Sequence, residues 1–136
     1  MTSTATPHPQ LNAIGLVVTD MAATIAFYRR LGLAFPDGAE SEGHVETRLP
    51  GGLRLMLDTV EIVRSFDRSW HGPSGGHRVA LAFSCAAASD VDSVHRQLVS
   101  AGYRSHLDPF DAVWGMRYAS VLDPDGNPAE LFAPLS

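Results

Sequence analysis

Glu130 is the residue whose position most directly suggests chemistry. It lies in DPDGNPAELF, residues 123–132, where a tight turn precedes a short apolar strand that carries a single carboxylate. The Asp-Pro-Asp-Gly-Asn part is typical of a turn, and we expect Gly126 to adopt a positive φ. A carboxylate in such a strand can bind a metal ion, a ligand or another side chain, or it can be solvated. The stretch alone leaves these alternatives open.

Strand alternation provides further candidates. In LRLMLDT, residues 53–59, three leucines alternate with Arg54, Met56 and Asp58. Alternating side chains lie on opposite faces of a strand, so these three share a face. If the leucines pack on a helix, that face points to a cavity or to solvent. Arg117 alternates with its neighbours in GMRYASVLD in the same way, and alternation does not show whether it points inward.

Two aromatic residues near a loop are candidates for ligand contact. Phe110 lies in the loop DPFDAVW and Trp114 follows it, at the start of an expected strand. Aromatic side chains beside a cavity can stack on flat ligands, and we expect this of both residues. The alternative is that they cover an end of the fold or pack in a dimer interface. We expect that alternative for Trp70, which lies in a predicted linker.

Composition limits the classes of partner. The 136 residues include 45% apolar residues and carry a formal net charge of -5, which suits one globular domain and disfavours nucleic acid or an anionic membrane. Cys85 is the single cysteine, so no disulfide can form within the chain, and we expect a small buried residue in a reducing cytoplasm. The first residues lack the features of a signal peptide, and no apolar run has the length of a membrane span.

The expected elements repeat along the chain and predict an α+β fold. We expect residues 1–9 to be a flexible tail and residues 10–136 to form one domain, with module one at 10–59, a linker at 60–76 and module two at 77–135. The first half has strands at 11–18, 33–36, 44–49 and 53–59 and a helix at 21–31. The second half has strands at 77–83, 103–107, 115–123 and 128–134 and a helix ending near residue 100. Each half is therefore a βαβββ module whose helix covers one face of a mostly antiparallel sheet.

Three stretches resemble the vicinal oxygen chelate superfamily, which includes glyoxalase I, extradiol dioxygenases and bleomycin-resistance proteins. They are LNAIGLVVTDMAATIAFYRRLGL, GGHRVALAF and DPDGNPAELF, and the resemblance extends over residues 10 to 134. It implies that the paired βαβββ modules curl into an open barrel around a ligand cavity. It also implies a homodimer. With a cavity present, Arg54, Met56 and Asp58 are expected to face it.

The resemblance also assigns four positions that bind metal in some members. Transferred to this chain, they read Ala13, Met56, His77 and Glu130. A catalytic divalent metal usually has at least three protein ligands, and neither an alanine nor a thioether is a suitable one. We therefore expect no metal cofactor. A divalent metal remains possible if His44 or Glu46 turns inward to complete the set.

His77 and Glu130 are expected on adjacent strands facing the cavity. They would either form a structural hydrogen bond, in which the carboxylate raises the pKa of the histidine, or contact a ligand as an acid–base pair.

The resulting prediction is a small-molecule-binding protein that sequesters a flat, partly apolar ligand, as bleomycin-resistance proteins do in antibiotic resistance. The alternative is an enzyme: a metal-dependent lyase, isomerase or dioxygenase that uses His77, Glu130 and an unidentified third ligand. A variant of that alternative is acid–base catalysis by His77 or Glu130 without metal.

Overall fold

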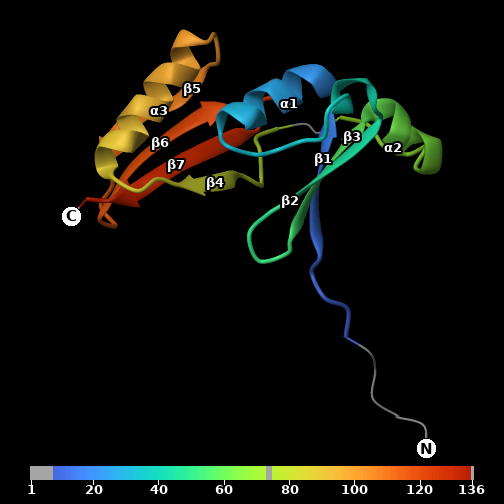
Figure 1. Cartoon of the computed structure of the whole chain (residues 1–136), viewed down its shortest axis with the longest axis horizontal. Coiled ribbons are helices and arrows are strands. Elements are labelled where there is room, and N and C mark those ends of the chain that lie inside the picture. The colour runs from blue at the N-terminus through green and yellow to red at the C-terminus, as the bar shows by residue number, and fades with distance from the viewer. Residues whose placement is uncertain (1–7, 73–74, 136) are drawn as a thin grey trace, which may run out of the picture.

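The computed structural model describes residues 8–72 and 75–135 and contains two separate sheets (Figure 1). The first sheet has the order β1-β3-β2, with β1 parallel to β3, and the second has the order β4-β7-β6-β5, with β4 parallel to β7. The first-half elements are β1 (Ala13–Val18), α1 (Met21–Arg30), the short 3-10 helix η1 (Ala39–Ser41), β2 (His44–Arg48), β3 (Arg54–Thr59) and α2 (Val60–Phe66). The second-half elements are β4 (Leu81–Ser84), α3 (Ala88–Ser100), β5 (Ser105–Asp111), β6 (Met116–Leu122) and β7 (Pro128–Pro134).

Helix α1 connects the two halves. Its start is capped by Asp20, whose side chain accepts a hydrogen bond from the backbone N–H of Ala23, and Arg29 and Arg30 lie in its last turn, where the helix dipole favours cations. The buried side of α1 packs on the first sheet and also reaches the second half, where the rings of Phe27 and Tyr103 meet edge to face at 4.9 Å. The two sheets therefore share one apolar core.

Asp123 fixes the turn that the sequence predicted before the last strand. Its buried carboxylate accepts hydrogen bonds from the backbone N–H groups of Asp125 and Asn127 and from the hydroxyl of Tyr28 at 2.7 Å. Burial, and then the neighbouring carboxylate, raise the pKa of Tyr28 far above its ordinary value, so the phenol stays protonated and donates. Gly126 has a φ of 85°, as expected. The turn is thus a structural link between α1 and β7.

The predicted α+β class and the repeated order of elements are confirmed, with local differences. Residues 33–36 form no strand, because the chain there turns back on α1 through a bond from Leu33 N–H to Tyr28 C=O. The predicted linker starts with the helix α2. Strand β4 begins four residues later than predicted, because its register places residues 77–79 opposite the turn at 125–127 and residue 80 opposite Pro128, which has no N–H to pair.

The sheets do not close into a barrel within one chain. Strands β1 and β4 each pair on one side only and lie at the edges of their sheets. Helix α3 covers one face of the second sheet, whereas α1 covers one face of the first (Figure 1). Each sheet therefore keeps one face that neither α1 nor α3 covers, and α2 contacts the first sheet at β1 and β3.

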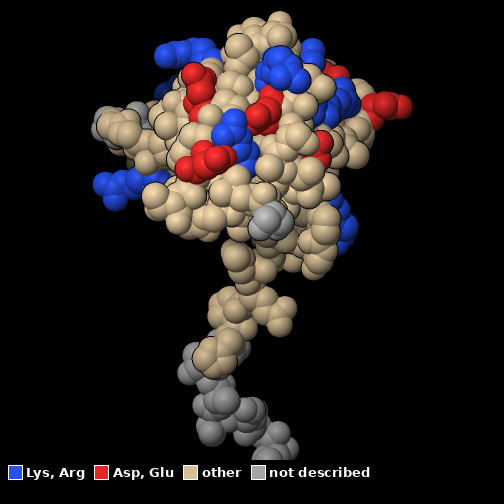
Figure 2. Space-filling model, turned by 90° about the vertical axis from the view of Figure 1, so that its left-hand side faces the viewer, with Lys and Arg blue, Asp and Glu red and all other residues tan. Residues whose placement is uncertain are grey.

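The charged side chains are mixed in sign at the end of the molecule that carries the second sheet. Figure 2 shows Asp and Glu beside Arg across this end, without an extended area of one sign. Within the described residues, no helix is both long enough and apolar enough to cross a membrane.

Candidate functional site

Most of the predicted site residues lie on the two sheet faces away from α1 and α3. The first open face is the side of the β1-β3-β2 sheet away from α1. Its side chains, given by the strand register, are Ala13, Gly15, Val17, His44, Glu46, Arg48, Arg54, Met56 and Asp58. The second open face is the side of the β4-β7-β6-β5 sheet away from α3. Its side chains are Ala82, Ser84, Leu107, Phe110, Met116, Tyr118, Ser120, Leu122, Pro128, Glu130, Phe132 and Pro134.

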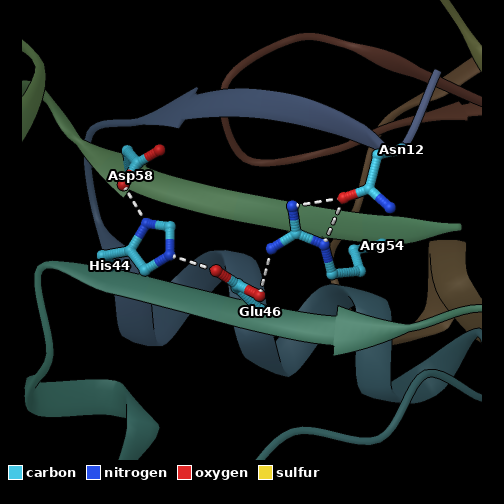
Figure 3. Close-up of polar contacts among 5 residues, drawn as sticks. All are labelled: Asn12, His44, Glu46, Arg54 and Asp58. Carbon is cyan, nitrogen blue, oxygen red and sulfur yellow. Dashed lines mark hydrogen bonds and ion pairs between the residues drawn. The ribbon is translucent and has the colours of Figure 1, made fainter. Parts of the chain in front are cut away.

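A continuous chain of polar contacts runs along the first open face (Figure 3). His44 lies between two carboxylates, with Nδ1 at 2.5 Å from Oδ1 of Asp58 and Nε2 at 2.7 Å from Oε2 of Glu46. The other oxygen of Glu46 accepts a hydrogen bond from Nη1 of Arg54 at 2.5 Å. Arg54 in turn donates from Nε and Nη2 to Oδ1 of Asn12 at 3.0 and 2.6 Å. Four charged groups in this chain therefore meet groups of opposite charge.

These contacts favour the charged form of His44. Hydrogen bonds to Glu46 and then to Asp58 raise the pKa of His44 above its ordinary value, while His44 and then Arg54 lower the pKa of Glu46. An imidazole whose two nitrogens both face carboxylates is best satisfied as the cation, because each nitrogen then donates a hydrogen bond. The arrangement therefore favours the protonated imidazole of His44 on the first open face.

The second open face carries aromatic rings instead. Phe110 of β5, Trp114 of the β5–β6 turn and Tyr118 of β6 form a cluster, with ring centroids 5.5 to 6.4 Å apart and planes steeply inclined. Trp114 is 60% exposed although it is large and apolar. Phe132 pairs with Tyr118 across the strands and extends the aromatic surface. The predicted positions of Phe110 and Trp114 are therefore next to one another.

Glu130 and Ser120 lie opposite each other on the same face. The register pairs them across β6 and β7, and Ala82 of β4 follows on the other side of Glu130. The Ser120 hydroxyl is 1% exposed and has no hydrogen-bond partner among the described residues. Glu130 is half-buried, and all the ion pairs recorded between described residues involve other groups. These two polar groups are left without a partner from the described part of the chain.

His77 does not accompany Glu130. It is exposed, precedes β4, and packs its ring edge-on against His106 with centroids 5.7 Å apart. Glu130 pairs with Ala82 in the second sheet as Met56 pairs with Gly15 in the first. Ala13 lies two residues before Gly15, so its equivalent in the second half lies two residues before Ala82. That residue is Ala80, which is three residues after His77. The expected pair of His77 and Glu130 is not formed, because the strand that would carry His77 is shorter than predicted.

The donor set does not fit a divalent metal of the kind that the resemblance implies. Of the four equivalent positions, Ala13 and Ala80 offer no donor and Met56 offers a thioether, which leaves Glu130 as the one hard ligand. His44 and Glu46 do lie on the first open face with Met56, but they bond to each other. No group of three His, Cys, Asp or Glu in residues 8–72 and 75–135 is placed to hold a metal.

Arg117 faces the opposite side of the second sheet. Its guanidinium bonds to Asp92 of α3 and to Asp111 of β5, each at 2.9 Å, so it belongs to the helix-covered face. This placement fixes the alternation of β6 and brings Tyr118 and Ser120 to the open face. Neither of these two residues was among the predicted site residues, and the contact of His44 with Asp58 was not predicted. The spacing of His44 and Glu46 in HVETR, which puts both on one face, is the signal that indicates the first open face.

Comparison with known proteins identifies the class. Residues 10–131 match the family described as the Glyoxalase/Bleomycin resistance protein/Dioxygenase superfamily, and the chain belongs to it. No match was found among curated proteins.

Several solved structures have a similar fold. A glyoxalase/bleomycin resistance protein/dioxygenase from Nocardioides is 23% identical, with 98% of this chain and 88% of that chain covered and a TM-score of 0.74. An enzyme of the same family from Burkholderia phytofirmans is 19% identical, with 93% and 100% covered and a TM-score of 0.79. A glyoxalase-related enzyme from Fulvimarina pelagi is 24% identical, with 91% and 87% covered and a TM-score of 0.76. At these identities the likeness concerns the fold.

Proposed function

We propose that this chain is a small-molecule-binding member of its superfamily that sequesters a flat, partly apolar compound on the second open face without a metal cofactor. The observation that carries this proposal is the cluster of Phe110, Trp114 and Tyr118 on a sheet face that no helix covers. Sequestration of a toxic aromatic compound in the cytoplasm, as in antibiotic resistance, is the corresponding role.

The physical argument concerns exposed aromatic area. Leaving a tryptophan largely exposed forgoes the hydrophobic stabilisation that its burial would provide. A flat ligand that covers Trp114 and Phe110 recovers that free energy and adds ring–ring contacts. The neighbouring rings hold Trp114 from the side, so little side-chain freedom remains to be lost on binding.

The proposal includes a homodimer. Strands β1 and β4 each have an unpaired edge, and an unprotected strand edge can pair with another chain. An apolar cavity of about 490 Å³ lies between the first sheet and β4. It is lined by Ile14, Leu33, Leu49, Pro50, Leu55, Ala80, Leu81, Ala82, Phe83 and Ser84. A second copy that joined these edges would cover the cavity and enclose the open faces, and light scattering after size exclusion gives the mass that tests this.

The first experiment is elemental analysis of the untagged protein with an EDTA-treated control. We expect much less than one divalent ion per chain, and no change in thermal midpoint on addition of nickel, zinc, manganese or iron(II). About one tightly bound ion per chain, removed with loss of thermal stability, would overturn the metal-free proposal.

The second experiment tests the aromatic cluster. Acridine, a flat and partly apolar probe, is titrated by calorimetry into the wild type and into Trp114→Ala. We expect the substitution to weaken binding about tenfold, in line with the loss of one good ring contact. Trp70→Ala is the matched control, since Trp70 lies after α2 beside Arg64 and away from the cluster. Equal binding by wild type and Trp114→Ala would contradict the proposal.

A further inference from the structure

We infer that the second open face selects an organic cation, a planar aromatic ring system that carries a positive charge, with Glu130 as its counter-ion. This inference rests on the proposed function and adds the chemical class of the ligand. It depends on the charges of this face, on the faces of its rings and on a buried hydroxyl.

Glu130 is the single charged side chain among the strand residues of the second open face. Its cross-strand neighbours are Ser120 and Ala82, and the remaining members of the face are apolar, aromatic or hydroxyl side chains. A half-buried carboxylate surrounded by such residues has lost part of its hydration without gaining a cation. A cationic ligand would compensate for the lost hydration of the Glu130 carboxylate, whereas an anionic ligand would be repelled by it.

The nearby arginine of the same sheet does not serve as the counter-ion. Arg117 is on β6 but points to the helix-covered face, where Asp92 and Asp111 already engage its guanidinium. On the first sheet, Arg54 is engaged by Glu46. No ion pair between described residues involves Glu130, so we expect its counter-ion to come from a ligand.

The rings favour the same sign of charge. The face of an aromatic ring carries negative electrostatic potential, so cations bind to it more strongly than neutral groups of the same shape. Trp114 provides the best such ring and is also the most exposed of the cluster. A planar cation placed between this cluster and Glu130 would meet favourable electrostatics on both sides.

Ser120 provides a second, independent indication of a ligand. Its hydroxyl is almost fully buried, has no partner among the described residues, and lies on the open face directly opposite Glu130. A buried polar group without a partner is rare, and the cost of leaving it so is removed when a ligand supplies a hydrogen bond. The natural ligand would therefore carry a polar atom near its charged end.

The test compares two probes of nearly the same shape at about pH 8. N-methylacridinium carries a permanent positive charge, and acridine is neutral at that pH. We expect the wild type to bind the cation at least about tenfold more tightly than the neutral probe, as a partly desolvated charge pair with a cation–π contact allows. Glu130→Gln should lose this preference while its affinity for acridine stays within about twofold.

Glu61→Gln is the matched control, because it makes the same substitution at an exposed position in the first turn of α2. It should keep the preference for the cation. If Glu130→Gln does not fold, the wild type alone still decides, since acridine-9-carboxylate should then be the weakest binder of the three probes.

Two outcomes would overturn the inference: equal binding of the cation and the neutral probe by the wild type, or an unchanged preference in a folded Glu130→Gln. Neither affects the proposed function if acridine still binds through Trp114. Failure of the proposed function would look different, because no probe would bind or Trp114→Ala would bind all of them unchanged.

Discussion

The two open faces occupy equivalent places in the repeated module, yet their chemistry differs. On the first, His44, Glu46, Arg54 and Asp58 form a chain in which opposite charges meet. On the second, Glu130 lies alone among rings and a buried hydroxyl. Polar groups that satisfy one another stabilise the fold, whereas those left without partners indicate a missing ligand. The face with fewer charges is therefore the better candidate for binding.

The same contrast is visible at one equivalent pair of positions. Met56 and Glu130 lie at matching places in the last strand of each module, opposite Gly15 and Ala82. The first has a soft apolar side chain beside a network of charges, and the second has a charge beside apolar rings. Each is surrounded by side chains of the opposite character.

The largest loss of stability is expected at Asp123, which connects α1 to the turn before β7. Asp123→Ala removes the acceptor for Tyr28 and for two turn N–H groups, and should cost about 3 kcal/mol of unfolding free energy because these buried donors lose their partner. Urea unfolding measures it, with Asp37→Ala on the surface as control. A loss below about 0.5 kcal/mol would show that the turn does not connect the halves as described.

Neutralising a charge should lower the unfolding free energy on the first open face and leave it nearly unchanged on the second. Arg54→Met removes the partner of Glu46 and Asn12 and should destabilise the protein by about 1 kcal/mol. Glu130→Gln breaks no contact among the described residues and should change the unfolding free energy by less than about 0.5 kcal/mol. The urea midpoints of the two variants test this difference. A larger drop in Glu130→Gln than in Arg54→Met would contradict it.

The pKa of His44 reports the chain on the first open face. Glu46→Gln and Asp58→Asn should each lower this pKa, because each removes a carboxylate that stabilises the imidazolium, and Glu46→Gln should have the larger effect. Since the folded pKa lies above the unfolded value near 6.5, the stabilisation is full below about pH 6.5 and is lost as pH rises through the folded pKa. Titration of the His44 ring by NMR measures the shift. An unchanged pKa in both variants would contradict the contacts of His44 with the two carboxylates.

The smallest effect is expected at Arg117. Its ion pairs lie on the helix-covered face and are partly exposed, so Arg117→Met should lower the urea midpoint only slightly. Affinity for N-methylacridinium should stay within about twofold. A large loss of affinity would mean that Arg117 reaches the ligand and that the assignment of faces on β6 is wrong.

The sequence predicted the fold well where the signal was local. The glycine turn at Gly126 and the alternation of LRLMLDT indicated elements that the structure contains. The predicted strand at residues 33–36 was wrong, because a tertiary contact with α1 replaces strand pairing there. His77 was assigned to a strand whose length depends on its register with β7, and local patterns do not contain that register.

The site was predictable only in part, for the same reason. Strand alternation placed Arg54, Met56 and Asp58 on one face, as the register shows. It did not orient Arg117, because that depends on Asp92, 25 residues earlier on α3. Nor did it reveal that Ser120 lies opposite Glu130, since the pairing of β6 with β7 is a property of the folded sheet.

The most direct test of the central claim uses the two tryptophans as internal reporters. The sequence contains only Trp70 and Trp114, so a nitrogen–proton NMR spectrum has two indole signals, one on the second open face and one after α2. On titration with N-methylacridinium, we expect the Trp114 signal to move in a saturable way while the Trp70 signal stays in place. Movement of Trp70 alone, or of neither signal, would contradict it.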